Sequence, residues 1–230
     1  DWLPQVWLPE VQPLDGRRIA EMLSSITQPQ LERYYKLRYD RACKHSDSAV
    51  TLSFDSTSIS TYSNTINAAA WGHAKQNPEL RQVNYMTVCD HATGDVVFAC
   101  SYDGSINDQT ILPEIYLRMK FAGLDLTNNI LVTDRGFQSI YNTQTVINLN
   151  LKYIQFLSLK EGAVKAHLQR HKQALCDSIA HKDPVLGISA IAVPEEWKEN
   201  TDAGPIPVKA YLHLYRDPVM AELQTNELYR

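Results

Sequence analysis

The sequence predicts an α/β fold in which one mixed β-sheet carries helices on its faces. Three segments of alternating apolar and polar residues follow one another with no helical pattern between them. This arrangement predicts three strands joined by close, antiparallel connections. Two short and nearly continuous apolar segments come next, each after a helical segment. Strands separated by helices are typical of parallel pairing, so the expected order from residue 50 onward is β-β-β-α-β-α-β.

Two helices are predicted in a lead-in over residues 1–47, ahead of the sheet. Their apolar residues recur at spacings of three and four, which is the period of an amphipathic helix. These residues are Ile19, Met22, Leu23 and Ile26 in the first helix, and Leu31, Tyr34, Tyr35 and Leu37 in the second. Because Pro29 lies between the two groups, we expect a joint there.

The first three strands are predicted over Val50–Asp55, Gln82–Cys89 and Val96–Tyr102. Each alternates apolar with polar residues, as a strand with one buried face does. Residues 90–95 contain Gly, Asp and Thr, which are typical turn residues. The second and third strands should therefore form an antiparallel hairpin.

The remaining elements of the sheet alternate with helices. A helix is predicted over residues 110–122, with Gly123 as its C-cap. The strand at 129–133 is almost entirely apolar, which predicts burial on both faces. A second helix over 139–149 and a second buried strand over 153–159 complete the core.

A different pattern follows Lys160. It begins the third of three predicted regions, 1–47, 48–160 and 161–230. The elements expected there are a polar amphipathic helix over 163–179, short strands over 187–193 and 208–215, a loop rich in Pro, Gly and Asp over 200–207, and a helical tail from 218 to 230.

Composition narrows the class of protein. The 230 residues are 44% hydrophobic and 21% charged, which excludes long disorder and collagen-like repeats. The 22 basic and 26 acidic side chains give a net charge of −4, which excludes a uniformly basic surface. No apolar run approaches the roughly 18 residues of a membrane span. No secretion leader is visible, and the four Cys form no Cys-x-x-Cys pair, so we expect a reduced, cytoplasmic location.

Two aspartates are candidate functional residues because of their positions. Asp55 ends the first predicted strand and Asp134 follows the fourth. The carboxyl ends of neighbouring parallel strands are where α/β folds build sites, so these carboxylates approach one another if the two strands are adjacent. A divalent cation would offset their repulsion, and oxygen ligands favour Mg²⁺ or Mn²⁺. Two such ions can activate a water or hydroxyl and stabilise the leaving oxygen in phosphodiester cleavage. The alternative for each Asp is a turn former or a helix N-cap.

Four segments in order resemble the successive motifs of DDE-type insertion-sequence transposases. They are Phe54-Asp55-Ser56-Thr57-Ser58-Ile59-Ser60, Trp71-Gly72-His73-Ala74-Lys75-Gln76, Tyr102-Asp103-Gly104-Ser105-Ile106-Asn107-Asp108 and Val132-Thr133-Asp134-Arg135-Gly136-Phe137. Members of this family are bacterial mobile-element enzymes with an RNase H-like core, related to retroviral integrases. The resemblance covers about residues 50–160 and extends more loosely to 214–218.

The resemblance implies metal-dependent cleavage and strand transfer at transposon ends. Asp55 and Asp134 look like the first and second catalytic acids, which hold two Mg²⁺ or Mn²⁺ ions. The implied partners are double-stranded DNA, as transposon ends and target, and a second copy in a homodimer, with no membrane and no nucleotide cofactor.

The third acid of the family is a Glu in a Tyr-x-x-Arg-x-x-x-Glu type of motif after a β-rich insertion. No Glu of this chain lies in such a motif. We therefore expect the third acid beyond Arg230, the DNA-binding region before Asp1, and residues 161–230 to begin the insertion. On this expectation the chain is a fragment that is inactive alone.

Three further residues are candidate DNA contacts within the same motifs. His73, Lys75 and Arg135 would reach phosphates. The alternatives are a loop held by its own hydrogen bonds for the first two, and an ion pair with Asp134 for Arg135. Asp108 either positions the site or caps the helix that follows, and we favour the cap. Gly136 is expected to allow the tight turn after the strand.

Two other patterns are compatible with a binding function. His167 and His171 share one helix face and suggest zinc, but Lys and Arg neighbours favour a solvated basic helix. Tyr34, Tyr35 and Tyr39 lie among Lys and Arg residues that would follow a DNA backbone. The alternative, slightly favoured, is that these aromatics pack on the core.

Two alternatives to a transposase stay open at this point. One is a non-catalytic relic of a transposase that binds DNA or protein. The other is an RNase H-like nuclease that acts without transposition.

Overall fold

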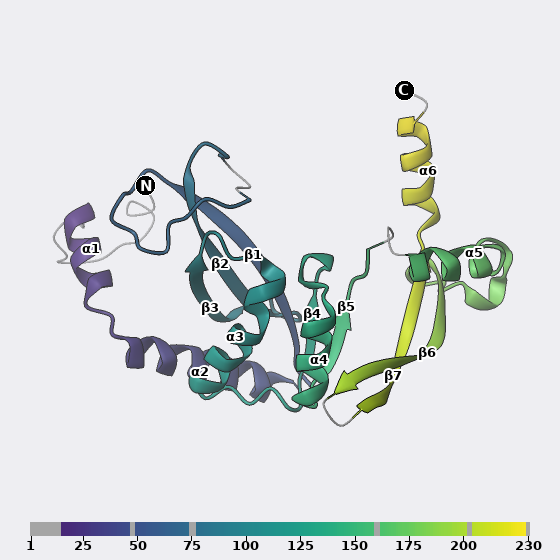
Figure 1. Cartoon of the computed structure of the whole chain (residues 1–230), viewed down its shortest axis with the longest axis horizontal. Coiled ribbons are helices and arrows are strands. Elements are labelled where there is room, and N and C mark those ends of the chain that lie inside the picture. Colours follow the sequence, from purple (N-terminus) through teal and green to yellow (C-terminus); the bar gives the residue numbers. More distant parts are fainter. Residues whose placement is uncertain (1–14, 47–48, 74–76, 159–161, 202–203, 229–230) are drawn as a thin grey trace. The chain divides into compact units, whose positions relative to one another are not determined.

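The computed structural model describes residues 15–46, 49–73, 77–158, 162–201 and 204–228. These residues form two compact units, of which the first ends at Gln155 and the second begins at Phe156. Figure 1 labels the elements of both units. None of the described helices combines the length and the apolar character needed to cross a bilayer.

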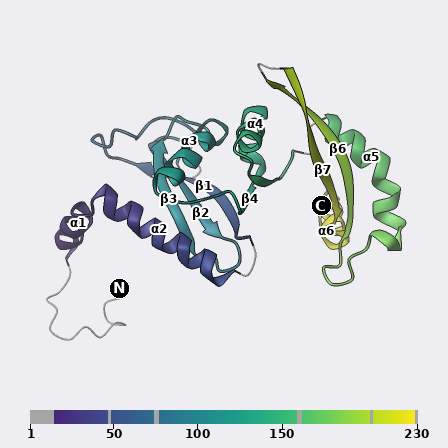
Figure 2. The ribbon, with the colours of Figure 1, turned by 90° about the horizontal axis from the view of Figure 1, so that it is seen from below.

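The first unit has the predicted order of helices and strands. Its elements are α1 (Gly16–Ser24), α2 (Gln28–His45), β1 (Thr51–Thr61), β2 (Arg81–Asp90), β3 (Val96–Asp103), α3 (Asp108–Phe121), β4 (Ile130–Thr133), the 3-10 helix η2 (Arg135–Phe137), α4 (Ile140–Asn148) and β5 (Lys152–Gln155). The five strands form one sheet in the order β3-β2-β1-β4-β5. Strands β1, β2 and β3 pair antiparallel, whereas β4 runs parallel to β1 and β5 runs parallel to β4. This is the predicted RNase H-like mixed sheet (Figure 2).

The alternating pattern of β1 explains how the sheet is covered. Leu52 and Phe54 are buried, and the buried phase continues through Ser56 and Ser58. The Phe54 ring meets the Tyr116 ring of α3 edge to face, with centroids 5.7 Å apart. The core of the unit is therefore built between the inner side chains of the central strands and α3.

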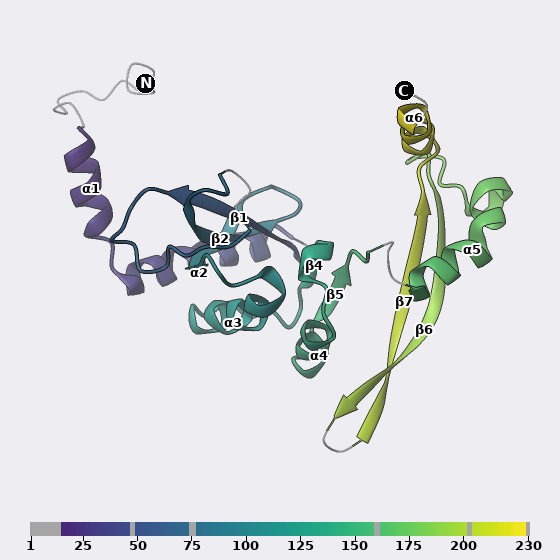
Figure 3. The ribbon, with the colours of Figure 1, turned by 45° about the horizontal axis from the view of Figure 1, so that its top comes forward.

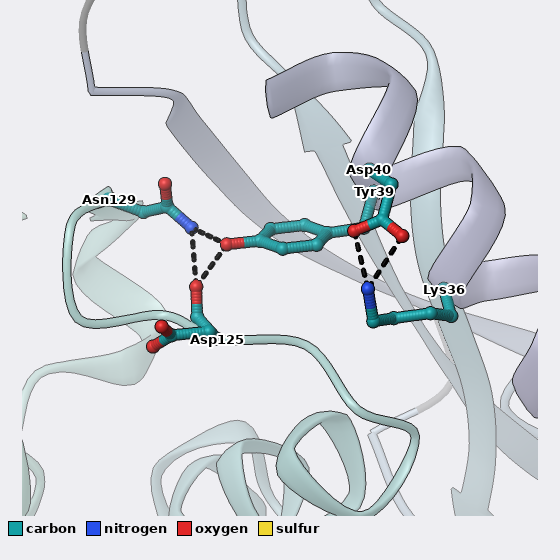
Figure 4. Close-up of polar contacts among 5 residues, drawn as sticks. All are labelled: Lys36, Tyr39, Asp40, Asp125 and Asn129. Atoms are coloured by element: carbon teal, nitrogen blue, oxygen red, sulfur yellow. Dashed lines mark hydrogen bonds and ion pairs between the residues drawn. The ribbon is translucent and has the colours of Figure 1, made fainter. Parts of the chain in front are cut away.

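Helix α2 packs Tyr35 and Tyr39 on the core, as the favoured interpretation expected, whereas Tyr34 is exposed. The Tyr35 ring lies 5.0 Å from the Phe98 ring of β3, between centroids. The Tyr39 hydroxyl donates to the carbonyl of Asp125 and accepts from Asn129 Nδ2 (Figure 4). Since Asn129 directly precedes β4, this network ties α2 to the start of that strand.

Three expectations about the strands were wrong. Strand β1 does not end at Asp55 but continues to Thr61, because its pairing with β2 continues to Thr61 opposite Arg81. Strand β5 is exposed or half-buried rather than buried, because it lies at the edge of the sheet. Ile130 and Val132 of β4 are also only half-buried, since the described residues do not fully cover the second face of this strand.

The second unit is a long hairpin with helices. Its elements are α5 (Gly162–Asp177), the 3-10 helix η3 (Ile179–His181), β6 (Ser189–Thr201), β7 (Gly204–Arg216) and α6 (Pro218–Leu228). Helix α5 packs on both strands (Figure 3). The loop predicted over 200–207 was wrong for residues 200–201 and 204–207, because they belong to β6 and β7 and Pro205 and Pro207 pair in register with β6. Residues 202–203 lie outside the described residues. A two-stranded sheet has two free edges, where a residue without an N–H is tolerated.

Two glycines allow a close backbone contact beside the sheet. A Cβ on Gly104 would lie 1.9 Å from the carbonyl oxygen of Gln82, and one on Gly72 would lie 2.0 Å from the carbonyl oxygen of Gly104. The Gly104 N–H also donates to the carbonyl of Ala68 at 3.0 Å. Only glycine lets these segments approach so closely.

We expect Gly104→Ala to lower the free energy of unfolding by at least about 2 kcal/mol, since the backbone must move to admit the methyl group. Urea titration followed by circular dichroism measures this. Gly16→Ala is the control, because nothing lies within 4 Å of a Cβ at Gly16, and it should change stability by less than about 0.5 kcal/mol. Equal effects of the two substitutions would contradict the proposed crowding.

The buried Tyr35 predicts a loss of stability at alkaline pH. Burial, with a smaller effect of Tyr85, raises the pKa of Tyr35 from 10.0 to about 12. Between these values the unfolded chain loses this proton and the folded chain keeps it, so stability falls as pH rises from about 10 to about 12. Tyr35→Phe should lose less stability than wild type over this range. Tyr34→Phe, at the exposed neighbour, should keep the wild-type profile. Identical profiles for Tyr35→Phe and wild type in denaturant titrations would refute the prediction.

Candidate active site

Asp55 and Asp134 occupy equivalent positions on neighbouring parallel strands. The pairing of β1 with β4 runs from Thr51 opposite Ile130 to Phe54 opposite Thr133. The next residue after each of these partners is an aspartate, so Asp55 and Asp134 both lie one residue beyond the last β1–β4 pair. The structure thus has the adjacent, parallel strands on which the expected juxtaposition depends.

The two aspartates differ in their local roles. Asp134 is the N-cap of η2, and its Oδ1 accepts from the Gly136 N–H at 2.8 Å. Asp55 caps nothing: it is an exposed residue inside a strand, and its Oδ1 accepts from the Ser56 N–H at 2.8 Å. Asp is unfavourable within strands, so the fold itself gives no reason for Asp55.

The surroundings leave the negative charge of both carboxylates uncompensated. Burial, and then the Asp55 carboxylate, raise the pKa of the Cys89 thiol. Burial raises the pKa of Tyr153, with a smaller contribution from Asp134. Both neighbours are therefore neutral at pH 7. No Lys, Arg or His in the described ranges forms an ion pair with either aspartate.

Asp108 does not cap α3, so the favoured expectation for this residue was wrong. The N-cap is Asn107, whose side chain accepts from the Thr110 N–H at 2.9 Å. The carboxylate of Asp108 instead accepts from Ser56 Oγ and from the Tyr102 hydroxyl, both at 2.6 Å. Burial, and then this bond to Asp108, raise the pKa of Tyr102 above its ordinary value.

A hollow of about 450 Å³, lined mostly by polar residues, opens next to Ser56. It is lined by β1, β2, the Gly72–His73 segment, residues 104–109 and Gly136. His73 and Gly136, which belong to different motifs of the sequence, thus reach the same hollow. Lys75 lies outside the described residues.

The turn after β4 presents Arg135 to solvent. Arg135 is exposed and forms no ion pair with Asp134 or with any other residue that the structure describes. Gly136 has no left-handed backbone, so the expected conformational reason was wrong. A Cβ there would lie 3.0 Å from Asp134 Oδ1, and glycine therefore leaves room for the carboxylate.

Sequence patterns alone did not single out Ser56 and Tyr102. Both are buried and both donate to Asp108. The sequence did contain a sign of the role of Ser56, because this polar residue occupies a position of β1 whose side chain points to the buried face. Its partner, 52 residues further along the chain, has no such signal.

No group of three or more His, Cys, Asp or Glu side chains in metal-binding proximity occurs among the described residues. This includes the helix α5. His167 Nε2 lies 2.9 Å from Glu195 Oε1 of β6, and the His167 and His171 rings are parallel with centroids 6.4 Å apart. His167 therefore faces the hairpin. The favoured expectation of a solvated helix had placed this side chain in solvent.

Neither a protein-family model nor a curated protein matches the sequence. Among solved structures, the chain is similar to piggyBac transposase in a synaptic complex with hairpin DNA, with a TM-score of 0.39 and 11% identity over 86% of this chain and 40% of that chain. It is also similar to Mos1 transposase in a paired-end complex with the left transposon end, with a TM-score of 0.33 and 13% identity over 77% of this chain and 58% of that chain. A third similar structure is Ciona intestinalis Endonuclease V with DNA, with a TM-score of 0.27 and 14% identity over 70% of this chain and 69% of that chain. The chain spans less than two thirds of both transposases.

We expect Asn142→Ala to destabilise the turn that carries Asp134. Asn142 is fully buried, and its Nδ2 donates to the carbonyl of Phe137 at 2.7 Å. Removing the donor leaves this carbonyl without its partner, at a cost of about 2 kcal/mol in the free energy of unfolding. Amide resonances of Arg135–Phe137 should shift as well. Asn148→Ala, at the exposed end of the same helix, is the control and should leave both observables unchanged. The prediction fails if the two variants behave alike.

Proposed function

We propose that this chain is part of a transposase-like enzyme that cleaves DNA strands and transfers them with the help of divalent metal ions. The observation that carries the proposal is the register of the central strands. Asp55 and Asp134 each follow the last paired residue of two adjacent parallel strands. This brings two acids, 79 residues apart in sequence, to one edge of the sheet.

The donor set fits a hard divalent cation. Each aspartate uses one oxygen to accept a backbone N–H. That bond orients the carboxylate and leaves the second oxygen to coordinate a metal. Carboxylate oxygens favour Mg²⁺ or Mn²⁺, and the neutral neighbours leave charge for a cation to balance. When bound, the ions supply Lewis-acid activation of the attacking and leaving oxygens of a phosphodiester.

Two side chains from the motifs suit a polyanionic substrate, although the hollow that His73 lines includes neither Asp55 nor Asp134. His73 lines the hollow beside Ser56, and Arg135 is exposed next to Asp134. Both side chains would contact phosphates of double-stranded DNA, together with Lys75. The net charge of −4 is compatible with this role, because the contact requires cations near the acids rather than a uniformly basic surface.

The finer assignment follows from the motifs. We place the chain with DDE-type enzymes of bacterial insertion sequences, which act on transposon ends and target DNA as homodimers. Two Mg²⁺ or Mn²⁺ ions and a third acid beyond Arg230 would complete the site. On this proposal the second unit begins the insertion that separates the second acid from the third.

Metal binding tests the assignment without requiring catalysis. Titration with Mn²⁺ should broaden the amide resonances of residues 55–56 and 135–136, because the paramagnetic ion lies beside them. Asp55→Asn and Asp134→Asn should each weaken Mn²⁺ binding by more than about tenfold. Removing a residue that only orients a metal ligand already costs about tenfold in affinity, so loss of a ligand should cost more. Asp177→Asn, at an exposed position of α5, changes the net charge equally and should bind like wild type.

Two outcomes would contradict the proposal. One is an absence of selective broadening at these amides in wild type at millimolar Mn²⁺. The other is equal affinity of wild type, Asp55→Asn and Asp134→Asn. Either result, combined with retained DNA binding in a gel-shift assay, would favour the non-catalytic relic instead.

A further inference from the structure

The start of α3 connects the segments that carry both acids. Asp108 accepts from Ser56 Oγ of β1 through Oδ2 and from the Tyr102 hydroxyl of β3 through Oδ1. The adjacent Gln109 donates from Nε2 to the carbonyl of Gln138 at 2.7 Å. One helix terminus thus holds β1, β3 and the turn that follows Asp134.

The contacts of Asp108 are stronger than the fold of α3 requires. Asn107 already caps this helix. Each oxygen of Asp108 accepts a hydroxyl at 2.6 Å, which is the short distance typical of a charged acceptor. Ser56 and Tyr102 are buried and Asp108 is half-buried, so these hydrogen bonds are partly shielded from water and strengthened. Both oxygens of Asp108 are thus engaged by side chains of the neighbouring strands.

The position of Ser56 links the Asp108 network to the orientation of Asp55. Side chains alternate across a strand, so fixing Ser56 on the inner face fixes Asp55 on the outer face. The Ser56 N–H also donates to Asp55 Oδ1 at 2.8 Å. A rotation of the backbone at Ser56 would therefore change the direction of the Asp55 carboxylate.

We propose that Asp108 is a positioning residue, whose carboxylate fixes Ser56 and thereby aims Asp55 at a divalent cation shared with Asp134. This inference rests on the proposed function, because it requires that Asp55 and Asp134 bind a metal ion. The Tyr102 hydroxyl completes the network by holding the second oxygen of Asp108 in place.

The test compares Mn²⁺ affinities of the whole chain, measured by isothermal titration calorimetry and by paramagnetic broadening at residues 55–56. Asp108→Asn, Ser56→Ala and Tyr102→Phe should each weaken binding by about tenfold, which is the loss expected when a partner that orients a metal ligand is removed. Asn107→Ala removes the cap of the same helix and leaves the network intact. It should lose stability but bind Mn²⁺ within about twofold of wild type, since no ligand partner is removed.

The variants separate positioning from two simpler explanations. If Asp108→Asn weakens binding while Ser56→Ala and Tyr102→Phe do not, the effect is one of net charge and positioning is overturned. If all three lose stability yet bind like wild type, the network is structural only and the proposal is again overturned. Should Asp108→Asn fail to fold, Ser56→Ala and Tyr102→Phe carry the test, because each deletes a single oxygen.

The same data distinguish this inference from the proposed function. If wild type shows no Mn²⁺ binding at these residues, both fall. If Asp55→Asn abolishes binding but the three network variants retain it, the proposed function stands and only the role of Asp108 is rejected.

Discussion

The parallel pairing of β1 with β4 is the interaction on which the candidate site depends. It ends at Phe54 opposite Thr133, and the chain places an aspartate immediately after each. The pairing rests on the core below it, because Leu52 and Leu131, which are register partners, are both fully buried. A slip of one residue would turn the side chains of β4 to the opposite face. Burial of the inner face therefore fixes the register, and the register places Asp55 and Asp134 one residue beyond the same strand pair.

Buried polar residues hold the segments around this edge. Gln82 and Asn84 of β2 donate from their side-chain amides to the connection between β3 and α3, at the carbonyls of Gly104 and Ile106. That connection leads directly to Asp108, whose carboxylate reaches back to β1. Hydrogen bonds inside a protein are costly to disrupt, so these contacts hold the connection that carries Asp108 against β2.

The helices and strands of the sheet were predictable because each has a local pattern. The errors arose where the outcome depended on distant residues. The predicted segment 153–159 has the apolar composition of a buried strand, yet the place of β5 at the sheet edge leaves its residues exposed or half-buried. Asp108 lies where a helix cap is expected, but Asn107 caps the helix. The carboxylate of Asp108 instead accepts a hydrogen bond from Ser56, 52 residues away in the sequence. The prolines near residue 205 suggested a loop, whereas the free edge of a two-stranded sheet accommodates them.

The sequence by itself determined the class of fold and the order of its elements, and it predicted Asp55 and Asp134 as metal-binding candidates. These follow from the periodicity of side chains and from residue types at strand ends, which act over a few residues. Only the tertiary structure decided that β1 and β4 are neighbours, that Asp55 lies inside a longer strand, and that Asp108 joins Ser56 and Tyr102. Those facts depend on contacts between residues far apart along the chain, for which local pattern carries no signal.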